Sequence, residues 1–201
     1  MIRNIVFDMG KVLLNYDAYR CCRHFLDDPA DQKVMADCLF SSGEWILLDV
    51  GVLSEEQAMR NIKSRLPERL HDAADLCMKH WHEYCMWPID GMKELVAELK
   101  QQGYGIYLCS NASLRMLTNQ QRIPGIEYFD GVLFSAEVRC IKPQKEMYEH
   151  LFSRFHLDPR ECFFIDDLDI NIEGARACGM DGYCFADGNV AALKKALADL
   201  E

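Results

Sequence analysis

The chain has 201 residues, half of them hydrophobic, and a formal net charge of −10. This length suits one domain, or one domain with an insertion, around a core of its own. The negative charge argues against nucleic acid as the main partner, because phosphate contacts need clustered Lys and Arg. No apolar run approaches the roughly 20 residues that cross a bilayer, so no membrane partner is expected.

Ten cysteines occur without a C-x-x-C pair and without a secretory signal ahead of them. We therefore expect reduced, mostly buried thiols in a cytoplasmic protein. The densest group of metal-binding residue types comprises Cys77, His80, His82 and Cys85. On one helix these four side chains would not share a face, so a zinc site there is not expected.

The first predicted strand is Ile5-Val6-Phe7, an apolar run close to Gly10. Such a run is typical of a buried strand in a parallel sheet. Asp8 follows it, at the strand end where ligands bind in open α/β sheets. A carboxylate there can act as a nucleophile, a metal ligand or both, although an acid at a strand end also often caps the next turn.

The region from Asp17 to Trp87 shows little strand signal and several helical patterns. Ser54-Glu55-Glu56-Gln57 is a capping-box pattern, which predicts a helix running toward Arg65. Other apolar residues recur at helical spacing before and after this segment. We therefore expect residues 15–87 to form an all-α helical bundle.

Beyond Pro88, helical and strand patterns alternate, which is typical of βαβ units and a parallel sheet. Strands are predicted near 105–109, 131–134, 162–165 and 183–185. Helices are predicted near 92–99, 143–156, 170–178 and 189–200, with Pro143 in a first helical turn. Residues 1–14 and 88–201 should then form an α/β core with a doubly wound, Rossmann-like parallel sheet, interrupted by the helical bundle as a cap.

Polar residues follow the predicted strands at their carboxyl ends: Asp8, then Ser110 with Asn111, then Lys142, then Asp166 with Asp167. A hydroxyl, an amide and an ammonium group can bind phosphate oxygens. Three carboxylates in one crevice would repel each other unless a divalent cation lay among them. This combination predicts a site for Mg²⁺-assisted phosphoryl transfer.

The order of these residues resembles the four motifs of the haloacid dehalogenase superfamily, over essentially the full chain. Asp8 matches the nucleophile, Ser110 and Asn111 the second motif, Lys142 the third, and Asp166 and Asp167 the acidic fourth. The helical bundle resembles the family's inserted cap. The segments 163–167 and 171–175 further resemble bacterial sugar-phosphate phosphatases, which include the glucose-1-phosphate phosphatases.

The resemblance implies that the Asp8 carboxylate attacks phosphorus and forms an aspartyl phosphate, which water hydrolyses. It implies Mg²⁺ bound by Asp8, the Gly10 carbonyl, Asp166 and Asp167, with Asp167 preferred as the direct ligand. Ser110, the amide of Asn111 and Lys142 would hold the transferring oxygens, and Lys142 would offset the charge of Asp8. Asn171 would orient the loop of the fourth motif.

Gly10 departs from the family's pattern, in which a second aspartate two residues after the nucleophile acts as general acid and base. The sugar-phosphate branch resembles this chain in having glycine there. General acid–base help is typically worth about 10²–10⁴-fold. A low rate, a good leaving group or a proton donor from the cap would each be consistent with Gly10.

Three other interpretations remain to be compared. The run from Asp167 to Asn171 resembles the start of a calcium-binding loop, but Ile172 and Cys178 occupy the positions that need Gly and Glu. A metal-free dehalogenase gains nothing from paired acids beside an anionic substrate. A catalytically weak or idle binding protein that keeps the fold is the third, and the retained motif residues argue against it.

The cap should contribute the contacts that select the substrate. Candidates are Tyr16, Asp17 and Arg20, then Trp45 and the turn Asp49-Val50-Gly51. Arg20 also fits a solvated helix charge, and Trp45 also fits a core position. The expected partner is a small phosphorylated metabolite, by resemblance a sugar phosphate, bound by a monomer or weak homodimer.

Overall fold

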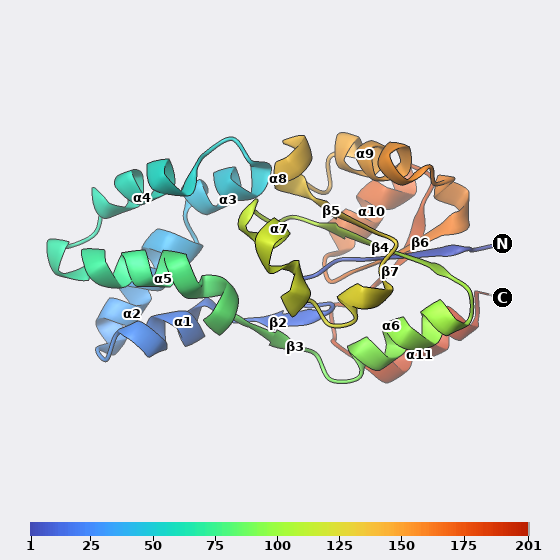
Figure 1. Cartoon of the computed structure of the whole chain (residues 1–201), viewed down its shortest axis with the longest axis horizontal. Helices are drawn as coiled ribbons and strands as arrows, with labels where there is room; N and C mark the ends of the chain where they lie inside the picture. Colours follow the sequence, from blue (N-terminus) through green and yellow to red (C-terminus); the bar gives the residue numbers. More distant parts are fainter. Residues whose placement is uncertain (201) are drawn as a thin grey trace.

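A parallel five-stranded sheet forms the centre of one half of the molecule in the computed structural model, which describes residues 1–200 (Figure 1). Its order is β5-β4-β1-β6-β7, so the chain starts in the middle and builds outward on both sides. The strands are β1 (Asn4–Phe7), β4 (Gly105–Ser110), β5 (Gly131–Phe134), β6 (Cys162–Asp166) and β7 (Asp181–Cys184).

Helices cover both faces of this sheet because β1 is apolar on both sides. Ile5 and Phe7 point into the core under α6 (Met92–Gln101) and α11 (Val190–Ala198), whereas Val6 points into the core under α9 (Lys145–Phe155) and α10 (Asp169–Ala177). Successive side chains of a strand alternate in this way. The predicted doubly wound α/β sheet is confirmed.

The other half consists of helices between β1 and β4 (Figure 1). They are α1 (Ala18–Phe25), α2 (Pro29–Met35) with the π-helical turn Ala36–Phe40, α3 (Gly43–Val50), α4 (Glu55–Lys63) and α5 (His71–Tyr84). The predicted capping box forms: Ser54 Oγ accepts from the Gln57 N–H at 3.2 Å, and Gln57 Oε1 accepts from the Ser54 N–H at 3.1 Å.

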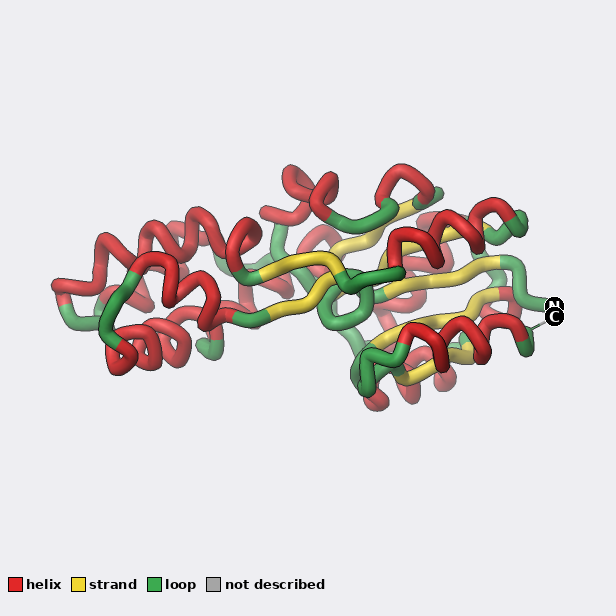
Figure 2. The backbone as a smooth tube through the Cα atoms, turned by 90° about the horizontal axis from the view of Figure 1, so that it is seen from below, coloured by secondary structure: helices red, strands yellow, loops and turns green. Residues whose placement is uncertain are grey.

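The helical region also has a short strand at each end, which the expected all-α bundle did not include. β2 (Leu14–Tyr16) pairs antiparallel with β3 (Met86–Pro88), and Figure 2 shows this ribbon joining the helices to the sheet. Both predicted boundaries, after residues 14 and 87, fall inside it. Three-residue strands separated by a long insertion carry no periodicity that a local pattern can reveal.

Two further differences concern where helices begin and end. The segment Asp49-Val50-Gly51 is not a free turn: Asp49 and Val50 end α3, and Gly51 caps it at a φ of 76°. Pro143 lies ahead of α9, which begins at Lys145 after an extended Gln144. Within residues 1–200, no helix is both long and apolar enough to cross a membrane.

Candidate active site

The carboxyl ends of the three central strands bring together the polar residues expected there. β1 lies between β4 and β6, at the point where the strand order reverses. Asp8 follows β1, Ser110 ends β4 and Asp166 ends β6. Open α/β sheets bind ligands in the crevice at this point.

Lys142 lies in the loop after α8 (Ser135–Val138) and connects two of the acids. Its Nζ lies 2.9 Å from Asp8 Oδ1 and 2.6 Å from Asp166 Oδ2, and all three side chains are buried. Burial alone would lower the pKa of Lys142, but the two flanking carboxylates raise it well above its usual range. The ammonium is therefore permanently charged in the site.

Asn111 holds the backbone of Lys142 in place. Its Oδ1 accepts from the Lys142 N–H at 2.8 Å, and its Nδ2 donates to the Lys142 carbonyl at 3.1 Å. Both ends of the side-chain amide are engaged in these bonds, and the expected contact of Asn111 with phosphate oxygens stays a prediction. Asn111 acts on the site through Lys142.

Asp8, Asp166 and Asp167 form an acidic cluster in which one oxygen from each lies within 4.8 Å of the others. Asp166 is fully engaged by the protein: Oδ2 accepts from Lys142, and Oδ1 accepts from the Leu168 N–H and from Asn171 Nδ2, each at 2.9 Å. Asn171 thus holds Asp166. Asp167 is half-buried, and its nearest cation is Lys11 at 3.7 Å.

Asp8 is a buried acid whose side chain is only partly hydrogen-bonded by the protein. Burial, reinforced by Asp166, raises its pKa to about 6, although Lys142 and Ser110 oppose this shift. Its Oδ1 is buried and, despite the nearby Lys142 Nζ, receives no well-formed hydrogen bond from any described residue. A buried carboxylate oxygen of this kind is free to bind a further positive group.

A cavity of about 260 Å³ opens in front of Asp8, between the sheet edge and the helical half. Asp8, Gly10, Ser110, Asn111 and Asp167 line one side of it. The other lining residues from the helical half and the β2–β3 ribbon are mostly aromatic and apolar: Tyr16, Trp45, Trp81 and Met86, together with Asp49.

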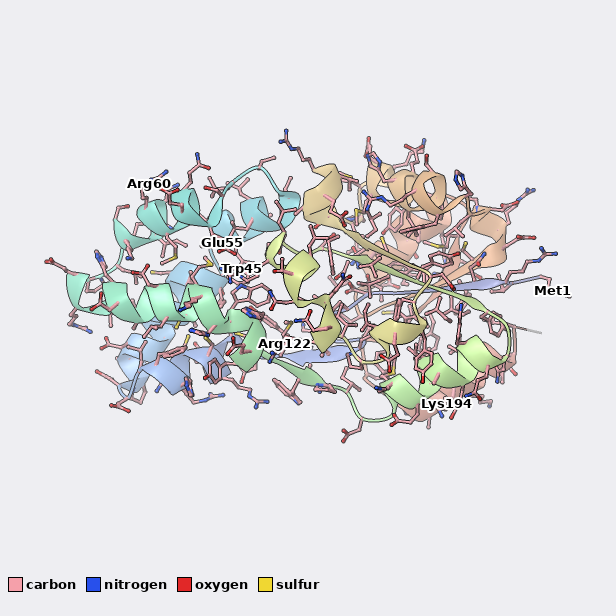
Figure 3. The ribbon with its side chains drawn as sticks, viewed as in Figure 1. Met1, Trp45, Glu55, Arg60, Arg122 and Lys194 are labelled. Carbon is pink, nitrogen blue, oxygen red and sulfur yellow. The ribbon has the colours of Figure 1, made fainter. Side chains whose placement is uncertain are left out.

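Trp45 lies at the border between the core of the helical half and the cavity. It packs against Phe40 and Trp81, with ring centroids 5.0 and 5.2 Å away, and it also lines the cavity. Figure 3 shows it in the helical half beside α5. Sequence patterns could not identify Trp81 or Met86 as cavity residues, because their helical or apolar context predicts a core position.

Asp17 and Arg20 lie outside the cavity, contrary to expectation. Asp17 caps α1 by accepting from the Tyr19 N–H at 2.9 Å, and its other oxygen accepts from Arg23 at 2.8 Å. The Arg20 guanidinium stacks over the Trp87 ring at 4.1 Å. Both side chains are thus engaged in structural contacts near the start of the helical half.

The comparison with protein families agrees with this arrangement. The model of the haloacid dehalogenase-like hydrolases matches residues 2–179. The chain therefore belongs to the haloacid dehalogenase-like hydrolase family, as the four motifs predicted.

Individual relatives include phosphatases. The chain is 27% identical to flavin mononucleotide hydrolase 1 of Arabidopsis thaliana, over 98% of this chain and 76% of that protein. It is 23% identical to a D-ribitol-5-phosphate phosphatase of Bacteroides thetaiotaomicron, over 91% of each. Among solved structures, a haloacid dehalogenase-family enzyme of the same organism, crystallised with magnesium and inorganic phosphate, superposes with a TM-score of 0.70 at 22% identity, covering 91% of this chain and 93% of that one.

Proposed function

We propose that this protein is a Mg²⁺-dependent phosphatase that hydrolyses a small phosphomonoester, with Asp8 as the nucleophile. The observation that carries this proposal is the acidic cluster with its buried lysine: three carboxylates within 4.8 Å and Lys142 Nζ between Asp8 and Asp166. Such a cluster is stable beside an anionic substrate only if a cation joins it. The relatives named above support a phosphate ester as substrate.

The residues present fit Mg²⁺. All the donors are oxygens, which this ion prefers, and Asp8 Oδ1 is buried without a well-formed hydrogen bond. Asp8, Asp167 and the Gly10 carbonyl would hold the ion, with Asp166 acting mainly through Lys142. When bound, Mg²⁺ supplies charge neutralisation between the nucleophile and the phosphate.

The chain's own residues account for the remaining chemistry. The Asp8 carboxylate attacks phosphorus and forms an aspartyl phosphate, which water then hydrolyses. Lys142 and the Ser110 hydroxyl bind the oxygens on which charge develops. Because Asn111 and Asp166 already fix Lys142, its ammonium needs little reorganisation during the reaction.

A sugar or polyol phosphate is the favoured substrate class. The cavity lies below the usual range of about 300–1,000 Å³ for ligand pockets, which favours a small molecule. Aromatic rings such as Trp45 and Trp81 can pack against the apolar face of a sugar. The relative named as a ribitol-5-phosphate phosphatase supports this choice.

A phosphomonoester with a flat ring is the second candidate. The aromatic wall of Tyr16, Trp45 and Trp81 favours stacking of such a ring. The relative named as a flavin mononucleotide hydrolase supports this alternative. The two candidates differ in size, so a substrate panel separates them.

Phosphate release from such a panel, with Mg²⁺ or with a chelator, tests the proposal. The panel should include pentitol and hexose phosphates, flavin mononucleotide and p-nitrophenyl phosphate. We expect release that needs Mg²⁺ and that Asp8→Asn abolishes, with the highest kcat/KM for a sugar or polyol phosphate.

Two results would overturn this proposal. Absence of release from every ester by a folded protein that still binds Mg²⁺ would favour the idle binding protein. Halide release from a 2-haloacid without metal would favour a dehalogenase. A preference for flavin mononucleotide would keep the phosphatase and replace the substrate class.

A further inference from the structure

The cavity contains one more acid that does not belong to the acidic cluster. Asp49, in the last turn of α3, lines the same cavity as Asp8 and is half-buried. Asp8, Asp166 and Asp167 share the cluster, whereas Asp49 comes from the helical half and lines the same cavity without belonging to the cluster.

Cleavage of an alkyl phosphomonoester needs a proton for the departing oxygen, because an alkoxide is a poor leaving group. Among the described cavity residues, Asp8 is the proposed nucleophile and Asp167 a proposed ligand of the cation. Burial raises the pKa of the Tyr16 phenol far above its usual range, so it releases its proton poorly. Lys11 is largely exposed and pairs with Asp167 at 3.7 Å.

Asp49 has the acidity that this task requires. Burial raises its pKa to about 7, although the backbone of Ser113 opposes the shift. Near neutral pH the side chain is therefore present in both its acid and its carboxylate form. A group that both donates and accepts a proton works best when its pKa is close to the working pH.

The backbone of Asp49 is hydrogen-bonded to residues at the carboxyl ends of the sheet strands, the end that also carries the nucleophile. Ser135 Oγ donates to the Asp49 carbonyl and accepts from the Ala112 N–H at 2.9 Å. Ala112 belongs to the loop directly after Ser110 and Asn111. The helix end that carries Asp49 is thus tied to the loop that carries two of the site residues.

Gly51 allows the same close approach. A Cβ atom at this position would lie 2.3 Å from the Ala136 carbonyl oxygen, and the φ of +76° also favours glycine. No larger residue fits without moving α3 away from α8. Asp49 is therefore held beside the site by the backbone of both halves, rather than by a flexible contact.

We propose that Asp49 is the general acid and base of the reaction, a role that rests on the phosphatase function proposed above. In the first step, Asp8 forms its bond to phosphorus, the bond from phosphorus to the leaving oxygen breaks, and the Asp49 proton passes to that oxygen. In the second step, Asp49 as carboxylate takes a proton from water, the water oxygen bonds to phosphorus, and the Asp8 carboxylate leaves. Asp49 ends protonated, ready for the next ester.

The dependence of rate on the leaving group tests this role. Asp49→Asn keeps the shape of the side chain but cannot transfer the proton. For glycerol phosphate, an alkyl ester, we expect the first turnover to slow by about 10²–10⁴-fold. For p-nitrophenyl phosphate, whose phenolate leaves unprotonated, we expect the initial burst of nitrophenolate to stay within about fivefold of wild type, since its cleavage needs little acid help.

The steady state should separate the two roles of Asp49. After the nitrophenolate burst, turnover of Asp49→Asn should fall and the phosphorylated chain should accumulate, because hydrolysis of the aspartyl phosphate has lost its base. Mg²⁺ binding measured by calorimetry should be unchanged in Asp49→Asn, whereas Asp167→Asn should weaken it. Asp49→Ser provides a second variant with the same expected signature.

Glu44→Gln is the matched control. Glu44 lies in the first turn of the same helix, pairs with Arg65 at 2.7 Å and does not line the cavity. This variant should behave as wild type with both esters.

Three outcomes overturn the role of Asp49. They are equal losses with the two esters, no loss with either, or a parallel loss in Glu44→Gln. A wild-type protein that releases phosphate from no ester overturns the phosphatase function itself, and this inference with it.

Discussion

The two walls of the cavity differ in how their side chains are held. At the sheet edge, Lys142, Asp166 and Asn171 are buried and each is engaged by another protein group. The facing wall contains Trp45, Trp81 and Met86, which make apolar, less directional contacts. Preorganised polar groups at the strand ends can stabilise charge in the transition state. An apolar wall contributes binding contacts that select the substrate. The comparison predicts that substitutions at the edge lower kcat and substitutions in the wall change KM.

Lys142→Met should have the largest effect of the variants that test this division. It removes the cation between Asp8 and Asp166 and leaves two carboxylates close together in a buried site. We expect kcat to fall by about 10²–10³-fold, the loss typical of one preorganised charge-stabilising group. The free energy of unfolding should fall by about 3–5 kcal/mol, as when a buried ion pair loses one partner.

Urea unfolding with and without Mg²⁺ measures the second effect. Mg²⁺ should restore part of the lost stability in Lys142→Met, because the ion replaces some of the missing positive charge. Unchanged stability in Lys142→Met would contradict the structural part of this account.

Trp45→Ala tests the opposite wall. We expect KM for the preferred ester to rise by about tenfold, equivalent to about 1.4 kcal/mol of binding, with kcat within about threefold of wild type. Ile46→Ala is the control, since Ile46 is the next residue of α3 and is 56% exposed. A fall in kcat at constant KM would show that the wall participates in the chemistry, contrary to the division of roles described above.

Asp49 predicts a pH dependence of stability in the protein without metal or substrate. Its pKa is about 7 in the folded state, above the usual value of 3.8 for an aspartate in water. Below pH 4 the side chain is protonated in both states, and it adds no penalty. Between pH 4 and 7 the unfolded state loses the proton first, so folding becomes less favourable.

Asp49→Asn should therefore be more stable than wild type above pH 7, by up to about 4 kcal/mol, and equal to it below pH 4. Thermal unfolding of both proteins between pH 4 and 8 measures this difference. A difference independent of pH would contradict the raised pKa of Asp49.

Arg20→Ala should have the smallest effect on activity. Arg20 stacks on Trp87 at 4.1 Å and does not reach the cavity, so kcat/KM should stay within about twofold of wild type. Loss of the cation–π contact should cost about 0.5–1 kcal/mol of stability. A tenfold fall in kcat/KM would indicate instead that Arg20 contacts the substrate.

The sequence predicted the sheet edge much better than the facing wall, for a physical reason. Asp8, Ser110 and Asp166 each end a strand, and parallel strands bring their carboxyl ends together whatever the intervening chain does. Strand prediction was therefore enough to place them in one site.

The wall depends instead on tertiary packing. Trp81 and Met86 have the apolar context of core residues, and the β2–β3 ribbon that helps to position them has no local signal. The engagement of Asn111 with the backbone of Lys142 joins segments 31 residues apart, so no local pattern predicts it.

Trapping of the phosphorylated enzyme tests the central claim most directly. The protein is mixed with its preferred ester and Mg²⁺, quenched in acid within a single turnover, digested, and analysed by mass spectrometry. This account predicts a phosphoryl group on the peptide that contains Asp8, formed at least as fast as phosphate is released and absent from Asp8→Asn. Phosphate release without any phosphoryl group on Asp8 would contradict it.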